Sequence, residues 1–202
     1  MSSALPSFTC FFHAAASALE SDGDSQRTNY RVDAVVAVRG EGVPGIEPGQ
    51  LWSRVERVGS LAVPAAPFLG STQHAVYTDA ATRSELSQIS STPSGPIAVL
   101  IPIRKAASWW ALGQDERQAY FTRGSRPGHT ALGRPFAGRI YRRLYHARYL
   151  PASTWDFLTY FEFAEAHAEA FRELLSILRD PAHNPEWAFV QRELEIWMRR
   201  AP

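Results

Sequence analysis

The sequence predicts an α+β protein in which strands and helices recur in both halves of the chain. Three observations support this class. Several short stretches alternate apolar and polar residues as half-buried strands do, one continuous apolar run is typical of a strand buried on both faces, and one later segment places apolar residues at helical spacing. Strands followed by helices in this order are expected to pack as antiparallel α+β layers, a pattern that a duplicated unit would produce, although no sequence repeat is visible.

The composition fits a globular protein and narrows its partners. The chain has 202 residues, enough for one large domain or two small fused ones, and 45% of them are hydrophobic. Its formal net charge is only +1, with acidic and basic residues interspersed. Because nucleic acids require a basic stripe or patch, no nucleic-acid partner is expected.

Two segments dense in glycine, proline or serine interrupt the chain, residues 40–50 and residues 90–96. The second break predicts a boundary between an N-terminal half, residues 1–93, and a C-terminal half, residues 94–202. In the N-terminal half, the patterns predict three strands and one short helix: residues 8–12, 30–38 and 73–78 as strands, and residues 79–89 as the helix. Residues 51–70 contain scattered glycine and proline and favour neither state.

The N-terminal apolar stretch is interpreted as a strand rather than a signal peptide, since no basic residue precedes it and His13 interrupts it. No run approaches the roughly 18 apolar residues of a membrane span. The single cysteine, Cys10, excludes an internal disulfide and a cysteine zinc cluster. A cytoplasmic protein without a membrane partner is expected.

In the C-terminal half, residues 97–103 form the continuous apolar run, and residues 114–121 and 165–179 are expected to be helices. Residues 155–163 predict another strand. The last segment, residues 187–199, fits both the strand and the helix period, and a strand is favoured because its apolar residues share one parity.

Residues 140–149 alternate strictly, which predicts a strand with two different faces. Tyrosines dominate one face. The other face places Arg142 between Ile140 and Leu144. An arginine in such a place usually lays its stem over apolar surface or pairs with a carboxylate.

The chain lacks a phosphate loop, a glycine-rich dinucleotide fingerprint, a G-x-S-x-G elbow and an H-E-x-x-H motif. The remaining candidates are polar residues near aromatic ones. Lys105 is the only lysine among 21 basic residues, and it lies shortly before the pair Trp109 and Trp110. Its ammonium is a point charge on a flexible stem, whereas an arginine would impose a planar fork.

Taken singly, the other candidates have ordinary structural interpretations. His129, in a helical or loop segment, would be a surface or core histidine, Glu186 a solvated loop acid, and the two tryptophans core or interface aromatics. Only their order along the chain is more specific.

In that order these residues resemble the chlorite dismutase family, specifically its short-chain, dimeric branch. The resemblance rests on "LIPIRK" followed by "WW" and "DER", then His129, then Arg142 at the start of "RRLYHAR", then "DFLTYFE" and a closing "EWAFVQRELEI". It is strong over residues 98–199, weaker through residues 74–86 and thin before them. It implies a dimeric α+β barrel of two ferredoxin-like halves with antiparallel sheets flanked by helices. The C-terminal half would bind haem b, and the N-terminal half no cofactor.

Matched residue by residue, His129 corresponds to the proximal ligand of the haem iron. Glu186 corresponds to the carboxylate that accepts a hydrogen bond from the other ring nitrogen of that ligand and raises its basicity. Lys105 corresponds to the lysine of this proximal and propionate network. Trp109 and Trp110 correspond to the tryptophan pair that packs beside the haem and toward the subunit contact.

Arg142 corresponds to the distal arginine of the family. The implied activity is haem b-dependent decomposition of chlorite to chloride and dioxygen by a homodimeric chlorite O2-lyase. Two alternatives stay open: a haem-handling protein without turnover, and the related coproheme decarboxylase, which carries a different distal residue. The sequence departs from the family at the pocket entrance, where a glutamine is usual and this chain has Ser90, with Gln88 two residues earlier.

Overall fold

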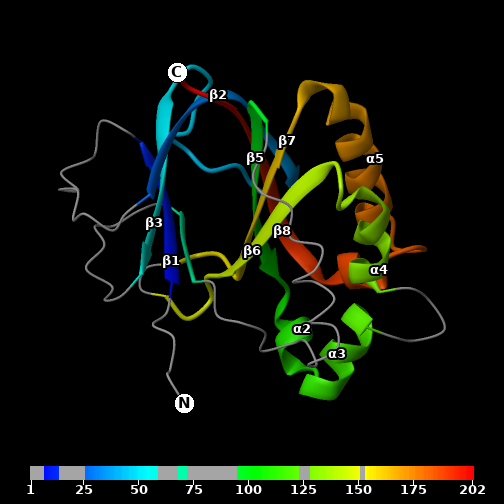
Figure 1. The fold of residues 1–202 in the computed structure, drawn as a ribbon. Helices are drawn as coiled ribbons and strands as arrows, with labels where there is room; N and C mark the ends of the chain where they lie inside the picture. Colours follow the sequence, from blue (N-terminus) through cyan, green and yellow to red (C-terminus); the bar gives the residue numbers. More distant parts are fainter. Residues whose placement is uncertain (1–6, 14–25, 59–67, 72–94, 123–127, 151–152) are drawn as a thin grey trace, which may run out of the picture.

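The computed structural model describes residues 7–13, 26–58, 68–71, 95–122, 128–150 and 153–202. In this part of the chain a strongly curled sheet carries helices along one side (Figure 1). Neighbouring strands of the sheet run antiparallel. The described strands are β1 (Ser7–His13), β2 (Gln26–Arg39), β3 (Leu51–Val58), β4 (Phe68–Ser71), β5 (Ile97–Lys105), β6 (Ile140–His146), β7 (Phe157–Phe163) and β8 (Val190–Arg200).

The strands close into a barrel in the order β1-β3-β2-β8-β5-β7-β6-β4, with β4 also paired to β1. Both halves share one arrangement when each is read from its last strand: β4-β1-β3-β2 and β8-β5-β7-β6. This is the ferredoxin-like order, fourth, first, third, second. The predicted α+β fold of two ferredoxin-like halves is therefore confirmed, and a duplication that leaves no repeat in the sequence is visible in the strand order. The predicted boundary between residues 93 and 94 lies outside the described residues.

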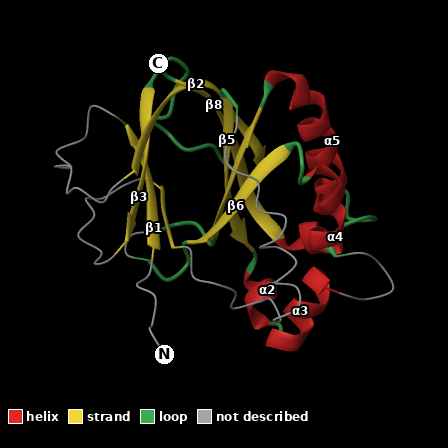
Figure 2. Cartoon of the chain, viewed as in Figure 1, coloured by secondary structure: helices red, strands yellow, loops and turns green. Residues whose placement is uncertain are grey.

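The helices lie on the side of the C-terminal sheet (Figure 2). They are α2 (Ala107–Ala111), α3 (Gln114–Thr122), α4 (His129–Gly133) and α5 (Ala168–Arg179), with 3-10 turns η2 (Arg134–Phe136), η3 (Glu165–His167) and η4 (Pro185–Phe189). The structure thus confirms the helices predicted near residues 114–121 and 165–179. The short helix α2, which carries the tryptophan pair, is not predicted by any periodicity because it is barely longer than one turn.

Strand β5 separates two apolar cores. Ala98 and Leu100 point into the barrel, whereas Val99 and Ile101 point to the outer side, where they pack with Phe171 of α5. All of these side chains are buried. The prediction that the apolar run is a strand covered on both faces is confirmed.

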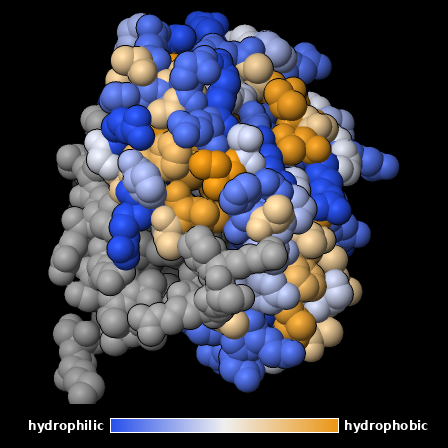
Figure 3. All heavy atoms as spheres, turned by 90° about the vertical axis from the view of Figure 1, so that its right-hand side faces the viewer, coloured by the Kyte–Doolittle hydropathy of each residue, from blue (hydrophilic) through white to orange (hydrophobic). Residues whose placement is uncertain are grey.

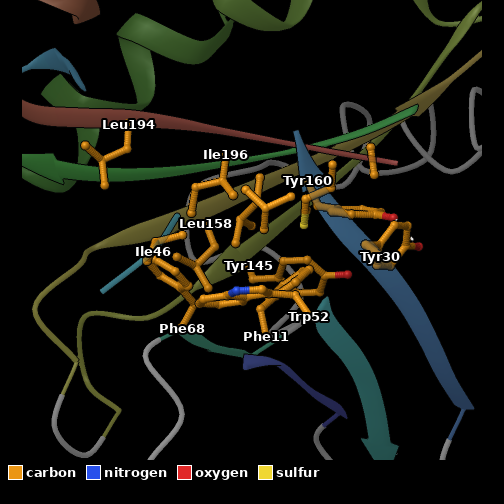
Figure 4. Packing of buried hydrophobic residues seen from close by; sticks show 14 of the residues in the cluster. Phe11, Tyr30, Ile46, Trp52, Phe68, Tyr145, Leu158, Tyr160, Leu194 and Ile196 are labelled. Carbon is orange, nitrogen blue, oxygen red and sulfur yellow. Dashed lines mark hydrogen bonds between the residues drawn. The ribbon is translucent and has the colours of Figure 1, made fainter. Parts of the chain in front are cut away.

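The interior of the barrel is apolar at one end and polar at the other. Ile46, Phe68 and Leu194 lie at the apolar end, while the hydroxyl-bearing rings of Tyr30 and Tyr160 lie at the other (Figure 4). Their side chains are buried, so each hydroxyl needs a hydrogen-bond partner inside the protein.

Glu162 supplies that partner. Its carboxylate is 1% exposed and accepts hydrogen bonds from the hydroxyls of Tyr30, at 2.7 Å, and Tyr160. Arg200 donates to the same carboxylate at 3.1 Å. Because Tyr30 belongs to β2 and the other three residues to β7 and β8, this network joins the two halves of the barrel.

The end of β6 and the start of β8 differ from the prediction. β6 ends at His146 because the next backbone N–H groups, of Ala147 and Arg148, donate to the carbonyl of Asp156 and form a turn. The strand expected over residues 187–199 begins only at Val190, since η4 opens with a proline that has no N–H for a sheet ladder. The strand at residues 73–78 and the helix at residues 79–89 lie outside the described residues.

Candidate functional site

The outer face of the C-terminal sheet is covered unevenly. Ile140 is buried in the cluster beneath α5. Further along the same face of β6, Arg142 is exposed and Leu144 and His146 are only half-buried. We call these last three residues the Arg142 face. The predicted alternation therefore holds, and it places the arginine where α5 no longer covers the sheet.

Arg142 is reachable by solvent and yet closely surrounded by protein. Desolvation by its surroundings lowers the pKa of its guanidinium, and the negative charge of Glu186 partly opposes this shift. Glu186 and Arg142 are therefore close enough to interact electrostatically.

Glu186 is held by the only lysine of the chain. Lys105 Nζ lies 2.6 Å from Glu186 Oε1, and only 4% of the lysine side chain and 11% of the glutamate side chain are exposed. The same ammonium lies 3.4 Å from the backbone carbonyl oxygen of Glu186. A buried carboxylate without a cation would be costly, so each charge stabilises the other.

Local backbone features bring this pair together. The ladder between β5 and β8 has an irregularity between Arg104 and Lys105, so that Lys105 pairs with Val190. The N–H of Ala106 then donates to the carbonyl of Phe189 at 2.8 Å, which ties the end of β5 to η4. Glu186 lies in that 3-10 turn and therefore reaches the lysine.

Trp109 packs beside the ion pair of Lys105 and Glu186. Its side chain is fully buried, with the ammonium of Lys105 4.7 Å from its ring centroid. Phe189 and Tyr120 pack against it, with ring centroids at 5.3 and 5.5 Å. The cation–π contact and the apolar rings limit the positions that the ammonium can take.

Trp110 has different neighbours from Trp109. Its ring stacks on Phe157 with centroids 6.0 Å apart, and the guanidinium of Arg148 lies 3.8 Å from its centroid. Its indole N–H is 3.4 Å from the Oδ2 atom of Asp156. The tryptophan pair thus links the lysine site to the β6–β7 turn.

Three acidic residues of this region were not singled out by sequence reasoning. Asp156 is 5% exposed and contacts Lys105, Trp110 and Arg148, as argued below. Glu193 and Glu195 both contact Arg179 at the end of α5, Glu195 at 2.5 Å. A sequence signal existed for Glu193 and Glu195, because the two glutamates occupy alternate positions of a strand whose opposite face is apolar.

Glu193 is electrostatically linked to the lysine site. Burial raises the pKa of its carboxyl, while the positive charges of Arg179 and Lys105 lower it. Lys105 therefore lies between two acids, Glu186 in direct contact and Glu193 at longer range.

His129 is the first residue of α4, directly after the N-cap Gly128. The side chain of His129 is outside the described part of the structure, as are Gln88 and Ser90. The structure thus brings together Lys105, Glu186 and Trp109, with Trp110 beside them and Arg142 within electrostatic reach of Glu186. Iron ligation by His129 stays a prediction.

Among the described residues, no group of three or more His, Cys, Asp or Glu side chains is arranged to hold a metal ion. The predicted site differs in kind, because iron held in a porphyrin needs only one or two axial ligands from the protein. No helix in the described ranges is long and apolar enough to cross a membrane.

Comparison with known proteins identifies the class. The structure superposes on the dimeric chlorite dismutase from Nitrobacter winogradskyi with a TM-score of 0.73 and 30% identity, over 95% of this chain and 99% of that one. It also superposes on the chlorite dismutase from Candidatus Nitrospira defluvii in complex with imidazole, with a TM-score of 0.65 and 20% identity, over 98% of this chain and 90% of that one. No family model and no curated protein matches the chain.

The barrel fold, together with these comparisons, thus defines a protein of the chlorite dismutase type. The chain belongs to the chlorite dismutase family, since its 30% identity to the Nitrobacter protein extends over nearly the whole of both chains.

Proposed function

We propose that the protein binds haem b and decomposes chlorite to chloride and dioxygen. The observation that carries this proposal is the position of Arg142, an exposed cation on the outer face of β6 that interacts electrostatically with Glu186. A permanent cation on a partly apolar face favours a small anion there.

The described residues fit a haem in three respects. The Arg142 face includes the half-buried Leu144, which provides apolar surface for a porphyrin, and it is backed by the buried Phe157 and Thr159 of β7. Lys105 supplies a cation of the kind that pairs with a haem propionate. In the structure this cation contacts Glu186. The helix α4, on the helix-bearing side of the sheet, begins with a histidine. When bound, the haem iron supplies the redox chemistry.

Three residues of the chain would hold the haem iron or support its ligand. His129 would hold the iron, and Glu186 would accept a hydrogen bond from the other nitrogen of its ring. That bond fixes the tautomer and increases the basicity of the imidazole. Lys105 would hold Glu186 in place, because its ammonium lies 2.6 Å from that carboxylate.

Arg142 would attract chlorite electrostatically and then retain the hypochlorite fragment until dioxygen forms. Retention matters more than attraction, since an escaping hypochlorite oxidises nearby side chains such as sulfur and aromatic groups. Leu144 and Thr159, cross-strand neighbours beside Arg142, would limit the space available to the fragment.

The proposal is tested on the purified protein reconstituted with haem b. An absorption spectrum reports haem binding, and an oxygen electrode reports dioxygen release after chlorite addition. Haem binding that is lost in His129→Ala, together with chlorite-dependent dioxygen in the wild type, is the expected result. Stable haem binding without dioxygen would favour the haem-handling alternative, and conversion of coproheme would favour the decarboxylase.

We also propose that the protein is a homodimer. The chain has six tryptophans and eleven phenylalanines, and apolar patches lie between hydrophilic ones on the helix-bearing side of the molecule (Figure 3). The Nitrobacter protein is described as dimeric. A second copy could cover part of such apolar surface. Light scattering at micromolar concentration should give twice the mass of one chain, and a monomer would refute the proposal.

A further inference from the structure

We infer that Asp156 is a positioning residue that sets the geometry of both Lys105 and Trp110. The functional part of this inference rests on the proposed haem site, whereas its structural part concerns contacts within the chain itself. Asp156 lies directly before β7, in the turn that follows β6, and its side chain is buried.

Three donors from three segments converge on its carboxylate. Oδ2 accepts the backbone N–H of Lys105 at 2.7 Å and lies 3.4 Å from the indole nitrogen of Trp110. Oδ1 accepts a hydrogen bond from the guanidinium of Arg148 at 2.8 Å. An ionised carboxylate can accept all three, because it has two oxygens and no proton to place.

The hydrogen bond from the Lys105 N–H to Asp156 takes the place of a missing backbone hydrogen bond of the sheet. The ladder between β5 and β7 ends at the pair Ile103 and Phe157, and the N–H of Asp156 donates to the carbonyl of Ile103 at 2.9 Å. Beyond that point β7 offers Lys105 no backbone acceptor, so the carboxylate takes its place. The backbone position of Lys105 then determines where its ammonium meets Glu186.

The bond to Arg148 acts on Trp110. The indole ring lies between Phe157, which stacks on it at 18° between planes, and the guanidinium of Arg148. By holding Arg148 and the indole N–H together, Asp156 fixes both the position and the tilt of the ring. One buried acid therefore couples the two predicted haem-facing elements, the lysine and the second tryptophan.

The inference predicts a difference between Asp156→Asn and Asp156→Glu. Asparagine keeps the shape, but it has a single acceptor oxygen and turns an NH2 group toward the other donors. At least one of the three bonds is lost. Glutamate keeps the charge on a longer stem, so it should restore part of the network.

The unique lysine allows a direct test without haem. In protein labelled with 15N- and 13C-lysine, the only lysine amide signal and the only lysine side-chain signal both come from Lys105. We expect Asp156→Asn to reduce the exchange protection of this amide about ten- to a hundredfold, as for loss of a hydrogen bond to a charged group. The side-chain signal should shift toward that of Glu186→Gln. The indole N–H signal of Trp110, identified with Trp110→Phe, should also move.

Asp180→Asn is the matched control, because Asp180 is a partly exposed acid whose side-chain hydrogen bonds, among the described residues, stay within its own turn. It should leave all three signals in place. Asp156→Glu should move them back toward the wild type. If Asp156→Asn lowered the melting temperature while the Lys105 and Trp110 signals stayed unchanged, Asp156 would be merely structural and the inference would fail.

A haem-loaded measurement then separates this inference from the proposed function. If haem binds, Asp156→Asn should shift the reduction potential in the same direction as Lys105→Met, and no shift would overturn the functional part. If the wild type binds no haem, the proposed function fails, while the lysine and indole signals still decide the role of Asp156.

Discussion

Lys105 donates a hydrogen bond to Glu186 over 2.6 Å, and the two residues are 81 positions apart in the sequence. Both side chains are largely shielded from water. The end of β5 and the turn η4 therefore form one unit, held together by a buried ion pair. Several properties of the protein are expected to depend on this pair.

Removing the lysine should destabilise the fold strongly. Lys105→Met leaves Glu186 buried without its cation, for which a loss of about 3 to 5 kcal/mol is usual. Urea unfolding of the apoprotein measures it. The double variant Lys105→Met/Glu186→Gln should recover part of the loss, because no unpaired charge remains. A loss below about 1 kcal/mol in the single variant would mean that water reaches the pair freely.

Glu186→Gln should raise the reduction potential of the haem-loaded protein. A carboxylate that accepts a hydrogen bond from the proximal imidazole stabilises ferric iron, and the neutral amide does so less. Each tenfold loss of preference for the ferric state corresponds to about 59 mV in a one-electron couple. Glu165→Gln, an exposed acid on η3, is the control and should leave the potential unchanged. An unchanged potential in Glu186→Gln with haem still bound would rule out the hydrogen bond to His129.

Arg142→Ala should bind haem and start to release dioxygen, but it should lose activity progressively. Without the cation, hypochlorite is no longer retained and reaches a chlorination trap in solution. Arg143→Ala provides a close control, since Arg143 is also exposed but its side chain points to the opposite face of β6. Equal dioxygen yield, lifetime and trapped oxidant in Arg142→Ala and wild type would exclude the proposed role.

His146 should make the fold less stable in mild acid. Burial lowers the pKa of its imidazole below 6.5, so the folded state binds this proton less readily than the unfolded chain. Stability therefore falls as the pH drops below about 6.5, by at most about 1.4 kcal/mol per pH unit, and levels off below the folded pKa. His146→Gln should flatten this dependence, because the substituted side chain carries no imidazole to titrate. Parallel curves for His146→Gln and wild type would contradict the prediction.

Glu162→Gln should weaken the joint between the two halves of the barrel. The carboxylate accepts from Tyr30, Tyr160 and Arg200, and an amide oxygen replaces those charge-assisted bonds only in part. A loss of at least about 2 kcal/mol is expected in urea unfolding. Glu169→Gln removes an exposed acid of α5 and should change stability by no more than about 0.5 kcal/mol. Similar effects of both substitutions would mean that the network adds nothing to the fold.

Elements defined by long periodic patterns could be predicted from the sequence. The apolar run of β5, the alternation of β6 and the helical spacing of α5 each arise because one or both faces of the element are buried. Burial of a face leaves a regular pattern of apolar residues that can be read from the sequence. For the same reason the alternation alone predicted that Arg142 shares a face with Ile140 and Leu144, whereas the structure identifies that face as the outer one.

Contacts between distant short segments could not be predicted in this way. The carboxylate of Asp156 accepts the backbone N–H of Lys105 in place of a backbone carbonyl of the sheet. Glu186 is positioned by a 3-10 turn that begins at Pro185. Neither feature produces a periodic pattern in the sequence. The family resemblance pointed to Lys105 and Glu186, but their contact distance and the role of Asp156 required the folded backbone.

The strand order has a consequence for the protein as it leaves the ribosome. β8 lies between β2 and β5, so both strands keep an unpaired edge until residues 190–200 have been synthesised. At the usual rate of translation, β5 waits about 4 to 17 seconds for this partner. During that interval the nascent chain exposes two edges that can pair with another chain, and barrel closure by β8 removes both at once.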